Sequence, residues 1–137
     1  MKILLATRNP KKLVELQRIL TGVSLVGLDD VPAYPEVPET GLTFAENALI
    51  KARAGVAATG LPTVADDSGL AVDALNGMPG VFSARWSGRH CDDKANLELI
   101  LAQVVDVPDP LRGAGFIAAA AQRSVLAQRA SAAGAPR

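Results

Sequence analysis

The sequence is poor in cysteine and histidine: among 137 residues, Cys91 is the only cysteine and His90 the only histidine. One cysteine excludes an internal disulfide, and this pair is too small for the usual four-ligand zinc site. Both residues are interpreted as incidental members of a loop. The apolar stretch after Met1 is too short for a secretory signal. We therefore expect a cytoplasmic protein with no disulfide and no zinc.

Charge of one sign and long apolar runs are also missing. Lys and Arg together number 14, as do Asp and Glu, so the formal net charge is zero. This balance gives no general electrostatic reason to bind nucleic acid or an anionic membrane. No apolar run approaches the roughly 18 residues of a membrane span. What is present, 49% hydrophobic and 20% charged residues, is typical of one soluble globular domain with a real core.

Hydrophobic periodicity predicts alternating strands and helices in the first half of the chain. Residues 2–6 are expected to form a strand, and a helix follows with Asn9 as its N-cap and Pro10 at its first position. The pattern then predicts a second strand, a proline-rich loop and a second helix stopped by Gly60. The corresponding ranges are 24–28, 29–41 and 43–59, and the apolar face of the first helix comprises Leu13, Leu16, Ile19 and Leu20.

The second half is expected to continue this alternation. Residues 61–65 and 70–74 are interpreted as two strands around a turn at Asp66 to Gly69, and residues 76–91 as a glycine-rich loop. Asp92 or Asp93 is expected to cap a third helix, whose apolar face is Leu97, Ile100, Leu101 and Val104. Alternating strands and helices predict an α/β fold, a mixed sheet flanked by helices. Residues 1–113 are assigned to this domain, and 114–137 to an atypical tail rich in Ala, Arg and Gln.

The first candidate site is the pattern Thr7-x-Asn9-x-x-Lys12, between a strand and a helix. Backbone N–H groups at a helix start attract anions, and a lysine adds a full positive charge. Thr and Asn side chains can also bind phosphate oxygens. The glycines of a Walker loop are absent. Taken alone, the pattern equally fits a capped helix with solvated lysines.

The second candidate is Asp66-Asp67-Ser68-Gly69, where two carboxylates stand side by side between apolar runs. A tight turn with side-chain capping would explain the residue types. The functional alternative is a carboxylate pair that holds Mg²⁺, with one member polarising water, because Mg²⁺ prefers a few carboxylates together with phosphate oxygens and water.

A third group surrounds the start of the second helix. Glu39 lies in the proline-rich loop, where a carboxylate has no evident structural task, so it is a metal-ligand candidate. Glu46 fits a capping box with Thr43. Lys51 is either a solvated face residue or a phosphate clamp. Arg85-Trp86 pairs a cation with an aromatic ring, and packing at the edge of the core is favoured over a platform for a base.

Taken in order, these segments resemble a known family. The stretches LLATRNPKKLVELQRIL, PETGLTFAENALIKARAG and TVADDSGLAVDALNGMPGVFSARWSG are similar to the inosine triphosphate pyrophosphatases, which act on XTP and dITP. The likeness covers about residues 1–112. It implies a two-lobed α/β fold, here with the second lobe truncated, with the nucleotide between the lobes. It also implies Mg²⁺-dependent hydrolysis of dITP, ITP or XTP to the monophosphate and pyrophosphate, by a cytoplasmic homodimer that clears non-standard purine nucleotides.

Carried over by position, the resemblance also implies roles for single residues. Thr7, Asn9 and Lys12 would bind the triphosphate, Lys51 would neutralise its charge and Ser68 would contact substrate. Glu39 and Asp67 would serve the metal, with Asp66 in support. Asp67 would in addition accept the proton of the attacking water.

The family's second half carries a Gly-Gly-Phe-Gly-Tyr-Asp-Pro stretch, a later Lys and a Ser-His-Arg motif, none of which occurs in this sequence. These motifs hold the base and close the cleft. A chain without them is expected to be a poor enzyme that distinguishes dITP from dATP weakly. The alternative function is a catalytically impaired remnant that binds phosphate or a partner chain.

Overall fold

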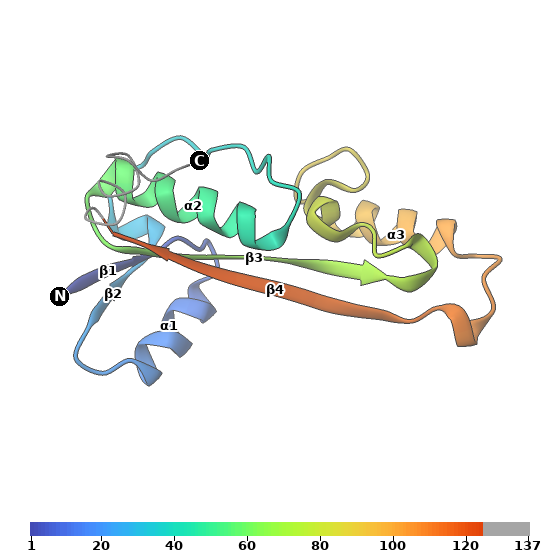
Figure 1. Cartoon of the computed structure of the whole chain (residues 1–137), viewed down its shortest axis with the longest axis horizontal. Coiled ribbons are helices and arrows are strands. Elements are labelled where there is room, and N and C mark those ends of the chain that lie inside the picture. Colours follow the sequence, from blue (N-terminus) through green and yellow to red (C-terminus); the bar gives the residue numbers. More distant parts are fainter. Residues whose placement is uncertain (125–137) are drawn as a thin grey trace, which may run out of the picture. The chain divides into compact units, whose positions relative to one another are not determined.

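The structure, a computed structural model, describes residues 1–124 and consists of four strands, three α-helices and short 3-10 segments (Figure 1). The 3-10 segments are Leu28–Asp30, Asp73–Leu75, Gly80–Arg85 and Asp109–Leu111. The strands and α-helices, in chain order, are β1 Lys2–Leu5, α1 Pro10–Ile19, β2 Ser24–Val26, α2 Phe44–Thr59, β3 Thr63–Val72, α3 Asp93–Gln103 and β4 Ala114–Arg123.

The four strands form one sheet in the order β2-β1-β3-β4. β1 is parallel to both of its neighbours: Leu4 pairs with Val26 of β2 and with Thr63 of β3. β4 runs in the opposite direction to β3 (Figure 1). The sheet is therefore mixed and carries helices, which confirms the predicted α/β class.

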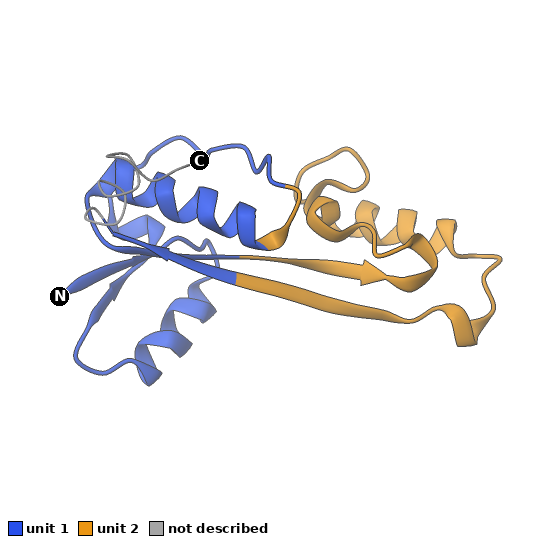
Figure 2. Cartoon of the chain, in the orientation of Figure 1, with its two compact units in different colours: residues 1–41, 45–66, 120–137 blue, residues 42–44, 67–119 orange. Residues whose placement is uncertain are grey.

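The described chain divides into two compact units (Figure 2). Unit 1 comprises residues 1–41, 45–66 and the chain from 120, and it contains β1, α1, β2 and nearly all of α2. Unit 2 comprises residues 42–44 and 67–119, with α3 as its long helix. β3 and β4 each contribute residues to both units.

In unit 1, α1 and α2 cover opposite faces of the sheet (Figure 1). Successive strand residues point to opposite faces, and Leu4 and Leu5 are nevertheless both buried, at 0% and 6% exposure. Burial of neighbours is the expected result when both faces of a parallel sheet are covered. α2 approaches β3 so closely that a methyl group added at Gly55 would lie 2.6 Å from Thr63 Cγ2. A small residue is needed there.

The start of α1 was predicted correctly. Asn9 Oδ1 accepts a hydrogen bond from the Lys11 N–H at 3.0 Å, and Pro10 is the first helical residue. The predicted apolar face is only partly right. Leu13 and Leu16 are half-buried, whereas Ile19 is 74% exposed and Leu20 is 38% exposed.

The predicted turn at Asp66 to Gly69 is wrong, because β3 runs without interruption from Thr63 to Val72. Gly69 serves a close approach instead of a turn. A methyl group there would collide with the Gly80 carbonyl oxygen and would lie 2.7 Å from Ser83 Oγ. Ser83 Oγ also accepts the Leu70 N–H at 2.9 Å, so this hydroxyl fixes the following loop against the strand.

Unit 2 has a small apolar core of Val72, Ile100 and Val104. Trp86 packs against this cluster, and its Nε1–H donates to Gln103 Oε1 at 2.9 Å, which confirms the packing interpretation of the Arg85-Trp86 pair. Asp92 caps α3, as predicted, by accepting the Ala95 N–H.

Only two of the four residues predicted for the apolar face of α3 are buried. Leu97 is 53% exposed and Leu101 is 56% exposed, whereas Ile100 and Val104 are buried. A spacing of three and four residues fits two adjacent stripes of a helix, and only the stripe with Ile100 and Val104 meets the core.

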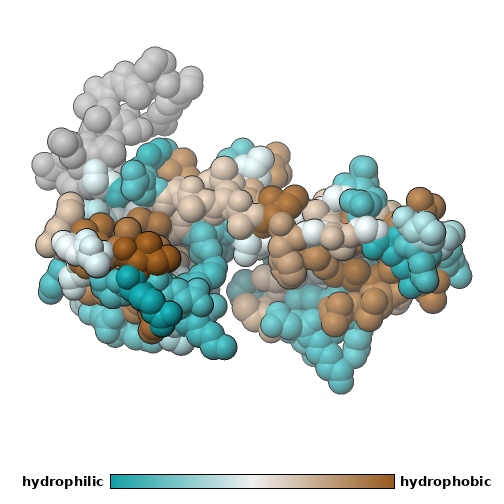
Figure 3. Space-filling model, turned by 90° about the horizontal axis from the view of Figure 1, so that it is seen from below, coloured by the Kyte–Doolittle hydropathy of each residue, from teal (hydrophilic) through white to brown (hydrophobic). Residues whose placement is uncertain are grey.

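β4 is an edge strand with apolar residues at the surface. Phe116 is 84% exposed and Ile117 is 48% exposed. The other large apolar residues of the predicted tail, Val125 and Leu126, lie outside the described residues. Figure 3, which is coloured by residue hydropathy, shows hydrophobic residues at the surface of the face in view. Within residues 1–124 no helix is both long and apolar enough to cross a membrane.

Candidate functional site

The loop between β1 and α1 is organised by its own side chains. Thr7 Oγ1 accepts the Asn9 N–H at 3.2 Å, and Asn9 Oδ1 caps α1 through the Lys11 N–H. The interpretation of this segment as a capped helix start is therefore correct, and it does not exclude phosphate binding by the same side chains. An accepting hydroxyl still has its own proton to donate, and an Asn side chain carries two N–H donors besides its oxygen. The loop thus presents donors at a helix start, where anions are favoured.

Lys12 connects this loop to β3. Its Nζ forms an ion pair with Asp66 Oδ2, and the two side chains are 44% and 32% exposed. The strand register explains the contact. Leu5 pairs with Val64, and the Ala6 N–H donates to the Val64 carbonyl at 2.9 Å. Two residues further along these parallel strands, Thr7 is level with Asp66. Lys12, in the first turn of α1, can then reach the carboxylate.

The loop that carries Glu39 is anchored on α2. Buried Asn47 accepts the Gly41 N–H through Oδ1 at 2.7 Å. A methyl group at Gly41 would lie 2.6 Å from Glu46 Cβ and 2.7 Å from Asn47 Oδ1, so only glycine fits. Glu46 itself is exposed in the first turn of α2. No local sequence pattern distinguishes Asn47. Its burial, which identifies it as the anchor, is visible only in the fold.

Lys51 lies one helical turn after Asn47 and therefore on the same face of α2. Its Nζ is 2.9 Å from Glu39 Oε1 and donates to the Asp66 carbonyl oxygen at 3.1 Å. The side chains of Lys51 and Glu39 are 30% and 26% exposed. Lys51 is thus not a fully solvated residue. It joins the Glu39 loop to β3, and unit 1 brings Lys12, Glu39, Lys51 and Asp66 into one chain of contacts.

The donor set of this cluster fits Mg²⁺. Glu39 and Asp66 provide carboxylate oxygens, which Mg²⁺ prefers, usually one or two of them with phosphate oxygens and water completing the coordination. No group of three or more His, Cys, Asp or Glu residues suited to a metal ion occurs within residues 1–124. A cage built from protein ligands alone is therefore not available in that part of the chain, and a phosphate-assisted site is the kind that fits.

The remaining two predicted residues belong to unit 2. Asp67 is only 8% exposed and Ser68 is exposed, and both lie within β3. Because side chains alternate along a strand, Asp66 and Asp67 point to opposite faces of β3. The adjacent carboxylates are thus two separate groups, and only Asp66 belongs to the Lys12 contact.

Arg8 was not predicted as a site residue, although a cation inside the Thr-x-Asn pattern was a visible signal. It pairs with Glu36 at 2.7 Å, with both side chains largely exposed. Arg8 also lowers the pKa of nearby Tyr34, but burial has the larger effect and leaves that pKa above its usual value. Arg8 further lines a cavity of about 160 Å³ in unit 1, together with Thr7, Asn9, Pro10, Leu13, Gly27, Leu28, Asp29 and Asp30.

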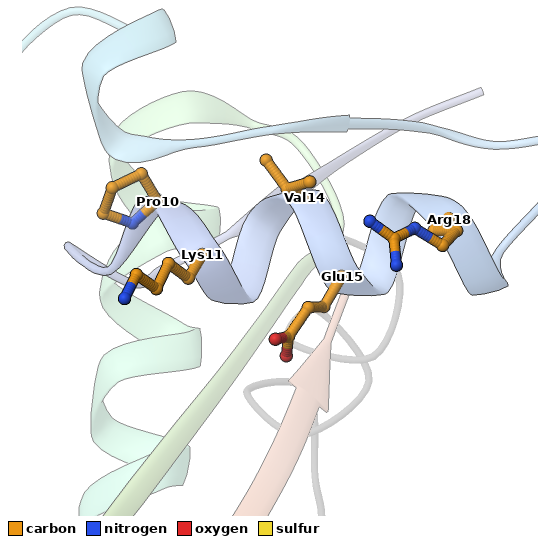
Figure 4. A pocket seen from close by; sticks show the side chains of 5 residues that line it. All are labelled: Pro10, Lys11, Val14, Glu15 and Arg18. Atoms are coloured by element: carbon orange, nitrogen blue, oxygen red, sulfur yellow. The ribbon is translucent and has the colours of Figure 1, made fainter.

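Another hollow, of about 310 Å³, lies along α1 and is less informative. Its lining side chains all project from α1 (Figure 4) and are Pro10, Lys11, Val14, Glu15 and Arg18. None of the predicted phosphate or metal residues is among them. The candidate chemistry of unit 1 is therefore located by its charged contacts and not by this hollow.

Comparison with known proteins shows which family the chain resembles. A dITP/XTP pyrophosphatase of Nocardia farcinica is 69% identical over 125 residues, which cover 88% of this chain and 61% of the relative. The crystal structure of a nucleoside-triphosphatase, dITP/XTP pyrophosphatase, from Mycobacterium abscessus is 68% identical, with a TM-score of 0.77, over 90% of this chain and 66% of that one. A HAM1 protein from Coxiella burnetii, at 39% identity, gives a TM-score of 0.79.

The chain thus spans less than two thirds of the length of these relatives. The model of the Ham1 family matches residues 3–133. That match includes β1, the Thr7 loop, the Glu39 loop, β3 and β4, and it confirms the resemblance predicted from the motifs. On this match and on the identity with its relatives, the chain belongs to the Ham1 family.

Proposed function

We propose that this chain binds the triphosphate of non-standard purine nucleotides, namely dITP, ITP or XTP, and hydrolyses it to the monophosphate and pyrophosphate. One observation carries the proposal. Lys12, Lys51, Glu39 and Asp66 come from separate segments and meet in unit 1, beyond the carboxyl end of β1. Ligands of open α/β sheets bind at the carboxyl ends of strands. The names of the relatives provide the substrate class.

The residues of unit 1 supply binding and charge neutralisation. Lys12 and the N-terminal N–H groups of α1 face phosphate oxygens, and Thr7 and Asn9 donate further hydrogen bonds. Lys51 neutralises phosphate charge. Glu39 and Asp66 are the residues of unit 1 that would hold Mg²⁺, with phosphate oxygens and water completing its coordination. When bound, Mg²⁺ would withdraw charge from the phosphate oxygens. Phosphoryl transfer needs little else than positioning and electrostatic stabilisation.

Asp67 is the proposed proton acceptor. A water molecule attacks phosphorus, Asp67 takes the proton of that water, and the bond between the α- and β-phosphates breaks to release pyrophosphate. Ser68 contacts the substrate beside it. A carboxylate on a strand is held more rigidly than one on a flexible loop, and Asp67 is nearly buried on β3.

The proposal also includes the cellular location, the cofactor and the oligomeric state. We place it in the cytoplasm, with Mg²⁺ as the cofactor and a homodimer as the working form. Neither nucleic acid nor membrane is a partner, in agreement with the balanced charge.

The test is the release of pyrophosphate from dITP, and from dATP for comparison, with Mg²⁺ and with EDTA. The proposal expects Mg²⁺-dependent release from dITP that Lys12→Gln reduces strongly. The matched control is Lys94→Gln, which removes the same charge from exposed α3. Absence of both binding and turnover would refute the proposal.

Binding without turnover would favour a second candidate, a phosphate-binding chain that docks on a partner chain. The exposure of Phe116 and Ile117 on edge strand β4 is the observation that supports it. An exposed apolar strand edge is a typical site for pairing with another chain.

A further inference from the structure

The charged groups of the candidate site are already paired with one another. Lys12 contacts the Asp66 carboxylate, and Lys51 contacts the Glu39 carboxylate. In each pair the cation is a proposed phosphate ligand and the anion is a proposed metal ligand. Each proposed phosphate ligand is thus paired with a proposed metal ligand of the protein itself.

Unit 1 connects the two pairs. Lys51 Nζ, besides contacting Glu39, donates to the main-chain oxygen of Asp66 at 3.1 Å. The backbone of Asp66 is thereby tied to one lysine, while its side chain is tied to another. A ligand that removes Lys12 from Asp66 changes the surroundings of a residue that Lys51 also holds. The two pairs should therefore respond together.

Charge balance decides which ligands can enter. A free polyphosphate that takes Lys12 and Lys51 separates Asp66 and Glu39 from these lysines and places both carboxylates beside an anion. A free divalent cation that takes the carboxylates leaves two lysines beside a cation. A metal-complexed polyphosphate satisfies both sets at once, because each carboxylate exchanges its lysine for the cation and each lysine exchanges its carboxylate for phosphate.

From this we infer that Asp66 and Glu39 are specificity-determining residues, which act as internal competitors for Lys12 and Lys51 and make unit 1 selective for metal-complexed polyphosphates over free ones. The inference rests on the proposed function and deepens it. By linkage, Mg²⁺ must raise the affinity for polyphosphate by the same factor as polyphosphate raises the affinity for Mg²⁺.

The expected size of the effect follows from exposure. The side chains of the Lys12–Asp66 pair are 44% and 32% exposed. Pairs in contact with solvent are screened and contribute up to about 1 kcal/mol, a factor of about five in an equilibrium constant. Freeing Lys12 should therefore raise the affinity for a metal-free polyphosphate about fivefold, and salt should reduce this gain.

The experiment measures binding of inorganic tripolyphosphate by calorimetry, with EDTA and with Mg²⁺, so that neither base recognition nor turnover enters. The wild-type chain should bind more tightly with Mg²⁺. Asp66→Asn should bind metal-free tripolyphosphate about fivefold more tightly than the wild type, and Mg²⁺ should improve its binding less. Glu39→Gln should change both quantities in the same directions, and it decides the question if Asp66→Asn does not fold. Circular dichroism checks the fold of each variant.

Glu98→Gln is the matched control. It removes one negative charge from the exposed Lys94–Glu98 pair on α3, where the two charged atoms are 3.9 Å apart. It should leave both affinities unchanged. If the wild type binds the Mg²⁺ complex but neither Asp66→Asn nor Glu39→Gln gains metal-free affinity, the inference is overturned and the proposed function stands. If the wild type binds tripolyphosphate under neither condition, both are overturned.

Discussion

Unit 1 and unit 2 differ in what holds them together. Unit 1 has parallel strands with both faces covered, and charged side chains from α1, the Glu39 loop, α2 and β3 contact one another. Unit 2 has the small cluster of Val72, Ile100 and Val104. Two of its ion pairs, Lys94–Glu98 and Arg112–Asp109, join close sequence neighbours on the surface. Charges from distant segments thus converge in unit 1, as expected of a site.

The helices α1 and α3 show why a local motif is not enough. Each has a capping side chain, Asn9 in one case and Asp92 in the other, that accepts a backbone N–H near 3 Å. Only α1 follows directly on a strand of the parallel sheet and carries a lysine paired with a distant carboxylate. The capping side chain explains why each helix begins where it does. The ion pair with a distant segment is what distinguishes α1 as part of the candidate site.

The largest effect is expected on the rate of hydrolysis, at Asp67 in unit 2. Such a loss of rate would show that unit 1 does not carry the function alone. Asp67→Asn removes the proposed proton acceptor while keeping the size of the side chain. Loss of a positioned base costs about 10²–10⁴ in rate. We expect that loss in pyrophosphate release from dITP, measured at saturating substrate. Asp106→Asn, at an exposed position of unit 2, is the control and should retain the rate. Equal rates for both variants would remove Asp67 from the mechanism.

The next effect concerns the core of unit 1. Leu4 is fully buried between α2 and the sheet, so Leu4→Ala leaves a cavity and should lower the free energy of unfolding by about 2–5 kcal/mol. Denaturant unfolding followed by circular dichroism measures it. A loss below about 0.5 kcal/mol would mean that the two covered faces of β1 contribute little to stability.

A smaller effect is expected at the start of α1. Asn9→Ala removes the acceptor of the Lys11 N–H and should destabilise the protein by about 0.5–2 kcal/mol. Asn9→Asp keeps an accepting oxygen and should restore the stability. If Asn9 also donates to phosphate, Asn9→Asp should still bind Mg·tripolyphosphate more weakly than the wild type. Unchanged affinity in calorimetry would limit Asn9 to its structural role.

The smallest effect is expected on the exposed stripe of α3. Leu101→Ala should change the free energy of unfolding by less than about 0.5 kcal/mol, since Leu101 is 56% exposed. Ile100→Ala, one residue away and 8% exposed, is its matched contrast and should cost about 2–5 kcal/mol. Similar losses for the two variants would show that a partner covers the stripe under the conditions of the measurement.

The sequence predicted features that depend on neighbouring residues better than features that depend on distant ones. Asn9, Pro10 and Asp92 act within one helical turn, and their roles were predicted correctly. Ser68-Gly69 favours a turn by residue type, but Gly69 is needed because the Gly80 carbonyl approaches β3, which no local pattern contains.

The same limit applies to the candidate site. The residue types and the family resemblance were enough to propose Lys12 and Lys51 as phosphate candidates and Glu39 and Asp66 as metal candidates. That Lys12 pairs with Asp66 and Lys51 with Glu39 depends on the parallel register of β1 and β3 and on the Asn47 anchor. These arise only when the sheet forms.

The most direct test of the central claim, that unit 1 is the phosphate site, is a map of backbone amide NMR shifts on addition of Mg·tripolyphosphate. Our account predicts the largest shifts at the amides of residues 7–9, 11 and 12, at Glu39 and at Asp66. It predicts no shift in α3 outside the exposed charged residues of that helix. Shifts centred on residues 93–103, or no shifts at saturating ligand, would contradict it.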